Sequence, residues 1–282
     1  MNPHTLDACL LFCLLNVPAD HWAAAWPPES TVVVRMASKA TRDAVDTMLL
    51  PVAVTCSRRT FADSGYNMCY NQLRLLSSVC LVTTLKLIDC LKQGEVLTSI
   101  APLAAVLPQC RGLEHLDLSF NCIGTAGLYM LQAPIAGCAG LTKLVMSGNC
   151  FGDEGATCLA EVITRLPALE YLDVARNSIS RDGITSIAQA LPHCPRLSVL
   201  LLGHNRTANA VDSLAVVLPL CPALTLIDVS HTGLGMEGLM IMYCALPHLR
   251  FVQIHAVGNP KIDNVACSNV LTRIHALFSR EH

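Results

Sequence analysis

The segment LEHLDLSFNCI, residues 113–123, is the most informative part of the sequence because its pattern recurs three more times along the chain. The further copies are LTKLVMSGNCF at 141–151, LEYLDVARNSI at 169–179 and LSVLLLGHNRT at 197–207. The starts at 113, 141, 169 and 197 are each 28 residues apart. A fixed period of about 20 to 50 residues is typical of a solenoid, in which each repeat packs only on its neighbours.

Each position of this motif has a physical reason. The fourth and sixth residues are apolar, and this alternation predicts a short parallel strand with its apolar side chains pointing inward. The ninth residue is asparagine, whose amide both donates and accepts, so a buried row of asparagines can satisfy loop backbone groups. Apolar residues then recur with the period of a helix, which a Leu-Pro pair such as Leu191-Pro192 ends. Glycine stands 14 residues after the start in four units, at Gly127, Gly155, Gly183 and Gly238.

Weaker copies extend the array in both directions. Before it, the motif positions are Leu49, Val52, Val54 and Ser57, then Val82, Leu85, Leu87 and Cys90. After it, they are Leu224, Ile227, Val229, Thr232 and Leu234, then Leu249, Val252 and Ile254. Terminal repeats of a solenoid are usually atypical. We expect poorer backbone satisfaction where Ser57, Cys90 and Thr232 replace the asparagine.

The motif resembles the ribonuclease-inhibitor type of leucine-rich repeat, which combines a strand and a helix in about 28 residues. The resemblance covers roughly residues 49–263. It implies an α/β leucine-rich-repeat horseshoe solenoid of about eight repeats, with a parallel concave sheet and outer helices. It implies protein–protein recognition and no enzymatic activity. We predict a helical cap over 1–46, repeats over 47–263 and a capping helix over 264–282.

The two ends carry weaker signals. The apolar runs 10–17 and 31–36, with Trp22 and Trp26 between them, predict two or three short helices. Residues 33–45 resemble the end of an F-box, and 14–18 resemble its opening, although Thr41 stands where that family has tryptophan. The segment is either an F-box-like contact for a ubiquitin-ligase adaptor or only the cap of the solenoid. The apolar stripe of 265–279 predicts a helix that covers the last repeat, with partner binding as the alternative.

Composition narrows the possible partners. Hydrophobic residues are 52% of the chain and charged residues only 14%, which predicts a large core or contact surface. The net charge of −2 and the lack of a long basic run argue against nucleic acid. No apolar run reaches the ~20 residues of a membrane span. Catalytic motifs are not found, and we expect no cofactor and no metal.

The 15 cysteines follow the repeat. Cys110, Cys138, Cys194 and Cys221 each stand three residues before a repeat start, and Cys122 and Cys150 each follow an asparagine. Free thiols in such columns are expected to pack as small apolar groups. We therefore expect a reducing compartment, the cytoplasm, with the chain free or within a large assembly such as a cilium or a ribosome.

Function should lie at the strand positions that the fold leaves free, namely the third, fifth, seventh and eighth of each unit. In the C-terminal half these positions combine apolar and aromatic residues with a polar edge, as interface cores do. The predicted partner-binding residues are Tyr171, Arg176, Val199, Leu201, His204, Leu226, Asp228 and Phe251. We expect the apolar members to be solvent-exposed in the isolated chain, unless another part of the chain covers them. His204 and His231 occupy equivalent positions, but two ligands alone make a poor metal site.

Two functions remain open. The first is a protein–protein interaction scaffold or assembly subunit that binds through the concave face. The second is an F-box-type substrate receptor of a ubiquitin ligase, with residues 1–46 on the adaptor and the repeats on the substrate. Adaptor binding distinguishes the two.

Overall fold

The computed structural model describes residues 5–6, 34–36, 51–57, 81–89, 96–206, 210–245, 252–259 and 262. A single ten-stranded sheet runs through them in chain order. Its strands are β1 (Thr5–Leu6), β2 (Val34–Met36), β3 (Pro51–Ser57), β4 (Leu81–Ile88), β5 (His115–Asp117), β6 (Lys143–Val145), β7 (Tyr171–Asp173), β8 (Val199–Leu201), β9 (Leu226–Asp228) and β10 (Gln253–His255). β1, β2 and β3 pair antiparallel, and every neighbouring pair from β3 to β10 is parallel.

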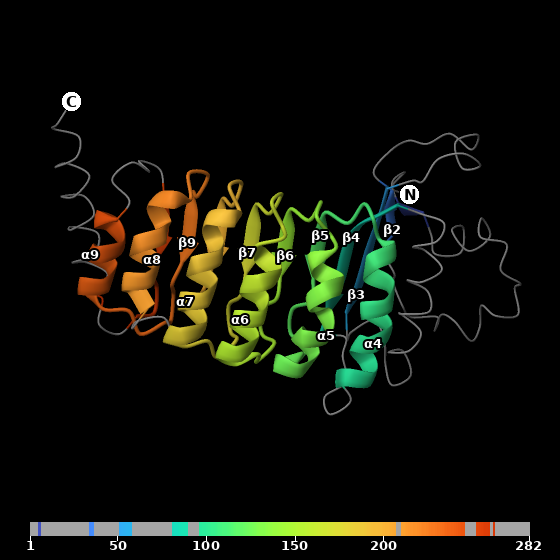
Figure 1. Cartoon of the computed structure of the whole chain (residues 1–282), viewed down its shortest axis with the longest axis horizontal. Coiled ribbons are helices and arrows are strands. Elements are labelled where there is room, and N and C mark those ends of the chain that lie inside the picture. The colour runs from blue at the N-terminus through green and yellow to red at the C-terminus, as the bar shows by residue number, and fades with distance from the viewer. Residues whose placement is uncertain are drawn as a thin grey trace, which may run out of the picture.

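The helices form a second layer, side by side along one face of the sheet (Figure 1). They are α4 (Val96–Val106), α5 (Gly124–Ala136), α6 (Gly152–Ile163), α7 (Arg181–Ala190), α8 (Val211–Val217) and α9 (Met236–Cys244). Three of the predicted Leu-Pro endings are single turns of 3₁₀ helix, at Leu107–Gln109, Leu191–His193 and Leu218–Leu220. The other face of the sheet carries no described helix and is the face that the sequence predicts to be concave.

The predicted alternation of inward and outward side chains is confirmed in the central repeats. Leu116, Leu144, Leu172 and Leu200 pair with one another across β5 to β8 and are fully buried between sheet and helices. Burying a leucine side chain contributes about 1.5–3 kcal/mol relative to exposure. One fully buried leucine in each of these four repeats therefore determines which strand positions point inward and which point to the other face of the sheet.

The buried asparagines form the predicted ladder. The Asn177 amide donates to the carbonyls of Val174 in its own repeat and Met146 in the preceding one, and its Oδ1 accepts the Asn149 N–H at 2.8 Å. Asn121, Asn149 and Asn205 repeat most of these contacts. Each amide thus ties two repeats together through backbone groups that water cannot reach.

The glycine at motif position 15 is a packing requirement. A Cβ on Gly183 would lie 2.6 Å from Ile179 Cγ2 and 2.8 Å from the Cβ of Ala156 on the neighbouring helix. These contacts are shorter than a methyl group tolerates, so the helix can approach its neighbour only without a side chain here.

The register at the two ends of the array corrects the sequence assignment by two residues. In the last repeat Ile254 pairs with Ile227, so Ile254 is the fourth motif residue and not the sixth. Asn259 is then the ninth residue and continues the ladder, since its Oδ1 accepts the Thr232 N–H at 2.9 Å. In the first repeat Val54 pairs with Leu85, so Val54 and not Val52 is the fourth residue. A bulge between Val52 and Ala53 lies beside this pairing.

The helix predicted over residues 31–36 is wrong where the structure describes this segment. Val34–Met36 is a strand paired antiparallel with β3, although we predicted a helix over 31–36. Backbone pairing with the edge of the sheet has overridden the local pattern. The other residues of the predicted cap 1–46, apart from the strand Thr5–Leu6, lie outside the described residues, as does the predicted helix 264–282.

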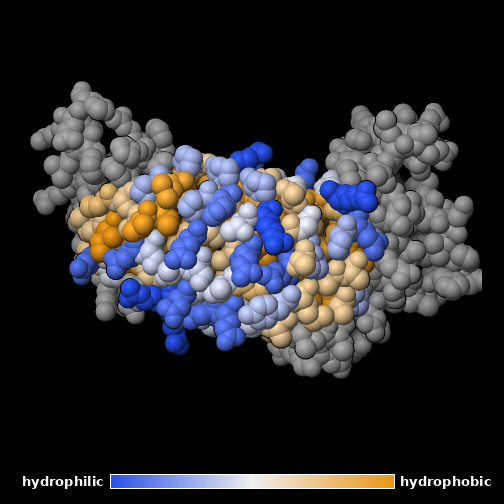
Figure 2. Space-filling model, in the orientation of Figure 1, coloured by the Kyte–Doolittle hydropathy of each residue, from blue (hydrophilic) through white to orange (hydrophobic). Residues whose placement is uncertain are grey.

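The outward faces of the helices differ along the solenoid. Figure 2 shows hydrophilic residues over α6 and α7, and strongly apolar residues over α8 and α9. Val216 on α8 is 73% exposed, and Leu220 in the 3₁₀ turn that follows α8 is 59% exposed. At the other end, Tyr129 of α5 is 55% exposed. In the part of the chain that the structure describes, no helix has the length and apolar character needed to cross a membrane.

Candidate functional site

The concave face is lined by two rows of side chains in register. The third motif positions form one row from β4 to β10: Thr84, His115, Lys143, Tyr171, Val199, Leu226 and Gln253. The fifth positions form the other row: Lys86, Asp117, Val145, Asp173, Leu201, Asp228 and His255. Since neighbouring strands lie about 4.8 Å apart, residues adjacent in these rows are in contact distance.

The predicted apolar centre is brought together, with one difference in exposure. Tyr171, Val199 and Leu226 are consecutive members of the third row, and Leu201 lies beside them in the fifth. All four side chains are half-buried, whereas we expected them to be solvent-exposed. The reason is lateral packing, because each side chain in a parallel sheet covers part of the side chains on the two adjacent strands.

The register moves the third position of the last repeat from Phe251 to another residue. The third position of the last repeat is Gln253, which pairs with Leu226, and the fifth is His255. Our assignment of Phe251 to the third position and of Gln253 to the fifth is therefore wrong. Phe251 itself lies outside the described residues. Asn259 is the signal that could have set the correct register, since its spacing matches a start at 251.

Charged residues surround the concave-face side chain of Tyr171. The Lys143 ammonium lies 4.0 Å from the centre of the Tyr171 ring, a cation–π contact between β6 and β7. Burial raises the pKa of the Tyr171 hydroxyl, and the carboxylates of Asp173, Asp117 and Asp228 act in the same direction. The phenol therefore stays protonated and can donate a hydrogen bond from the centre of the concave face.

The aspartates of the fifth row have a structural task. Asp117 accepts the N–H of Ser119 at 3.0 Å, Asp173 that of Ala175 at 2.9 Å, and Asp228 that of Ser230 at 2.8 Å. Burial raises the pKa of Asp173, and the bonds from Ala175 and Ser147 oppose that shift. We predicted Asp228 as a partner contact at the rim, and the structure shows that one of its oxygens already holds the turn after the strand.

The eighth motif positions form a rim above these rows. Arg176, His204 and His231 follow β7, β8 and β9, and all three are exposed. An Arg176 Nη2–H donates to His204 Nε2 at 2.8 Å, and the His204 and His231 rings stack with centroids 4.3 Å apart. The positions of Arg176 and His204 agree with their predicted place at the polar edge.

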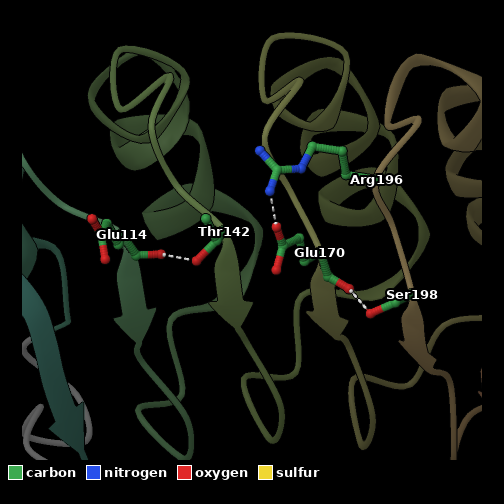
Figure 3. A network of polar contacts seen from close by, with 5 residues as sticks. All are labelled: Glu114, Thr142, Glu170, Arg196 and Ser198. Carbon is green, nitrogen blue, oxygen red and sulfur yellow. Dashed lines mark hydrogen bonds and ion pairs between the residues drawn. The ribbon is translucent and has the colours of Figure 1, made fainter. Parts of the chain in front are cut away.

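A second polar row borders the opposite ends of the strands, where the second motif positions lie (Figure 3). The Thr142 hydroxyl donates to the Glu114 carbonyl at 3.1 Å, and the Ser198 hydroxyl donates to the Glu170 carbonyl at 2.9 Å. The Glu170 carboxylate also forms an ion pair with Arg196. These bonds connect successive repeats.

The described histidines and cysteines are not arranged as metal ligands. Among the described residues no three His, Cys, Asp or Glu side chains are grouped to hold an ion. The His204 and His231 rings are only 12° from parallel, so their nitrogen lone pairs do not converge. Cys110, Cys138, Cys194 and Cys221 are free and buried. Burial raises the pKa of the Cys194 thiol to about 12, far from the thiolate that metals prefer.

Comparison with known proteins finds leucine-rich-repeat sequence in two segments of the chain. The family profile described as Leucine Rich repeat matches residues 109–131 and 138–160. The tropomodulin C-terminal domain of Caenorhabditis elegans is 14% identical, with 52% of this chain and 90% of that chain covered and a TM-score of 0.45. The leucine-rich-repeat-containing protein LegL7 of Legionella pneumophila is 20% identical, with 70% and 64% covered and a TM-score of 0.46. No curated protein matches the sequence. The matched repeats and the parallel sheet with one helix per repeat make the fold an α/β leucine-rich-repeat solenoid.

Proposed function

We propose that this chain is a protein–protein interaction scaffold or assembly subunit that binds a partner protein through its concave face. The fold is typically a binding scaffold without catalysis, and we infer that this chain is not an enzyme. The 28-residue spacing and the α-helix in each repeat support the ribonuclease-inhibitor type. The free buried thiols support a reducing compartment, the cytoplasm.

One observation carries the proposal. Tyr171, Val199 and Leu226 form an unbroken apolar row that the solenoid core does not use. They retain accessible apolar area, and the exposed Arg176 and His204 border them. An apolar, aromatic centre with a polar edge is the composition of an interface whose binding energy is concentrated in a few residues.

The F-box alternative has less support. Val34–Met36, within the F-box-like stretch, is a strand that extends the sheet. We therefore propose no adaptor contact for residues 1–46. Mixing the chain with the cullin-linked adaptor gives a direct check, and co-elution that disappears on replacing Leu14, Leu15 and Pro18 would restore this alternative.

A pair of matched double variants tests the concave face. The first is Tyr171→Ala with Leu226→Ala, and the control is Tyr129→Ala with Val216→Ala on the outer helices, where the same residue classes are exposed. We expect proteins captured from a cell lysate by the wild type to be lost by the concave variant and kept by the control, with both variants folded by circular dichroism. Retention by the concave variant and loss by the control would place the interface on the outer helices and overturn the proposal.

A further inference from the structure

The rim of the concave face carries a basic row that the core does not need. Arg176, His204 and His231 hold the eighth position of three consecutive repeats, with φ of 57°, 56° and 55°. The same position is glycine at Gly148 and Gly258, which adopts this left-handed conformation without strain. The three residues thus share one left-handed φ, which repeats the same turn after each strand.

These side chains are in direct contact. The Arg176 guanidinium donates to His204 Nε2 at 2.8 Å, and the His204 ring stacks on His231 at 4.3 Å between centroids. The His231 ring lies over Gly258, where an added Cβ would come within 2.1 Å of it. Glycine in the next repeat thus makes the room in which the second imidazole lies flat.

The described carboxylate that acts on this cluster is Asp228. Among the described residues Arg176 has no carboxylate within ion-pair distance. Asp228 on β9 faces His204, but its Oδ1 already accepts the Ser230 N–H. Asp228 keeps its negative charge while it accepts this bond, so it offsets part of the positive charge at the cluster, and no ion pair among the described residues involves Arg176.

We propose that Arg176, His204 and His231 form an oxyanion site that receives a phosphorylated side chain of the partner protein. This inference deepens the proposed function and rests on it for the source of the anion. Guanidinium and imidazolium N–H groups donate charge-assisted hydrogen bonds to phosphate oxygens. A phosphoryl dianion matches up to three positive charges in a row better than a single carboxylate does.

Binding and protonation are coupled at this site. Partial burial lowers the pKa of His204, the charges of Arg176 and His231 act in the same direction, and Asp228 opposes them. The further titratable neighbour is His255 on β10, which pairs with Asp228. An oxyanion favours the protonated form of the His204 imidazole, so affinity must rise as the pH falls.

Sulfate is the first probe because it stays a dianion across the relevant pH range. The full chain is titrated with sodium sulfate at constant ionic strength, and the histidine ring resonances are followed by NMR. We expect saturable shifts at His204 and His231, with affinity about tenfold higher near pH 6 than near pH 7.5. Arg176→Ala should weaken the affinity at least about tenfold, and the matched exposed control Arg165→Ala should leave it unchanged.

O-phosphoserine and acetate, compared at pH about 7, distinguish a phosphoryl group from a carboxylate. Tighter binding of O-phosphoserine supports the proposal, and equal binding of acetate overturns it. Linear shifts without saturation, or equal shifts in Arg176→Ala and Arg165→Ala, also overturn it. None of these measurements needs the partner protein. Failure of the anion site can therefore be distinguished from failure of the proposed concave-face interface, which the capture experiment with the double variants tests.

Discussion

The two faces of the central strands differ in what constrains them. Leu144, Leu172 and Leu200 point inward, are fully buried, and are all leucine. Lys143, Tyr171 and Val199 precede them by one residue, point to the concave face, and are a cation, an aromatic and an aliphatic residue. The solenoid therefore fixes one face by packing and leaves the composition of the other free, which is where recognition can be encoded.

The largest expected effect is on the buried face. Leu144→Ala should lower the free energy of unfolding by about 2–5 kcal/mol, because it leaves a cavity in a close-packed core. Lys143→Ala, one residue earlier on the half-exposed face, should cost less than about 1 kcal/mol. Urea unfolding of both variants measures the contrast, and equal losses would mean that the two faces are not distinct.

The asparagine ladder is expected to come next. Asn177→Ala should cost about 3 kcal/mol, since it leaves the Asn149 N–H and the carbonyls of Met146 and Val174 without their buried partner. Ser178→Ala, at the exposed neighbouring position, should change stability by about 0.5 kcal/mol or less. A small effect of Asn177→Ala would show that water can replace the amide and that the ladder is not essential.

The buried thiols predict a loss of stability in alkali. Burial raises the pKa of Cys110, Cys138 and Cys221 to about 11 and that of Cys194 to about 12, from 9.0. The unfolded chain loses these protons first, so their stabilisation is complete below pH 9.0 and decreases as the pH rises toward 11. Each thiol contributes at most about 1.4 kcal/mol per pH unit. Urea unfolding at several pH values gives the free energy of unfolding as a function of pH. We expect Cys194→Ala to make its fall above pH 9.0 less steep. An unchanged fall would show that ionisation of this thiol does not cause the loss of stability.

The smallest effect on stability, and the largest on binding, is expected at the concave face. Tyr171→Ala and Leu226→Ala should each lower the free energy of unfolding by about 1 kcal/mol, because both side chains are half-buried. Once a partner has been captured, each should weaken its binding by about 1–3 kcal/mol, measured by calorimetry. If these variants unfold the chain instead, the residues belong to the core.

The central repeats could be predicted from sequence because several independent signals agree there. Leucine spacing and asparagine place Leu116 to Leu200 in one phase, and glycine supports it in three of these four repeats. The last repeat has Ile254 at a position where two registers both look apolar, and only Asn259 decides between them. The sequence predicts that the eighth motif position is polar in these repeats. It does not predict the contact between Arg176 and His204, because that contact depends on a left-handed backbone conformation.

The concave-face interface is tested most directly by a photo-crosslinking amino acid placed at one residue of each face. Gln253 is exposed and pairs with Leu226, and Val216 is exposed on α8. We expect irradiation in cells to give a discrete adduct with another protein from position 253 and none from position 216. An adduct from position 216 alone would contradict the account and place recognition on the helices.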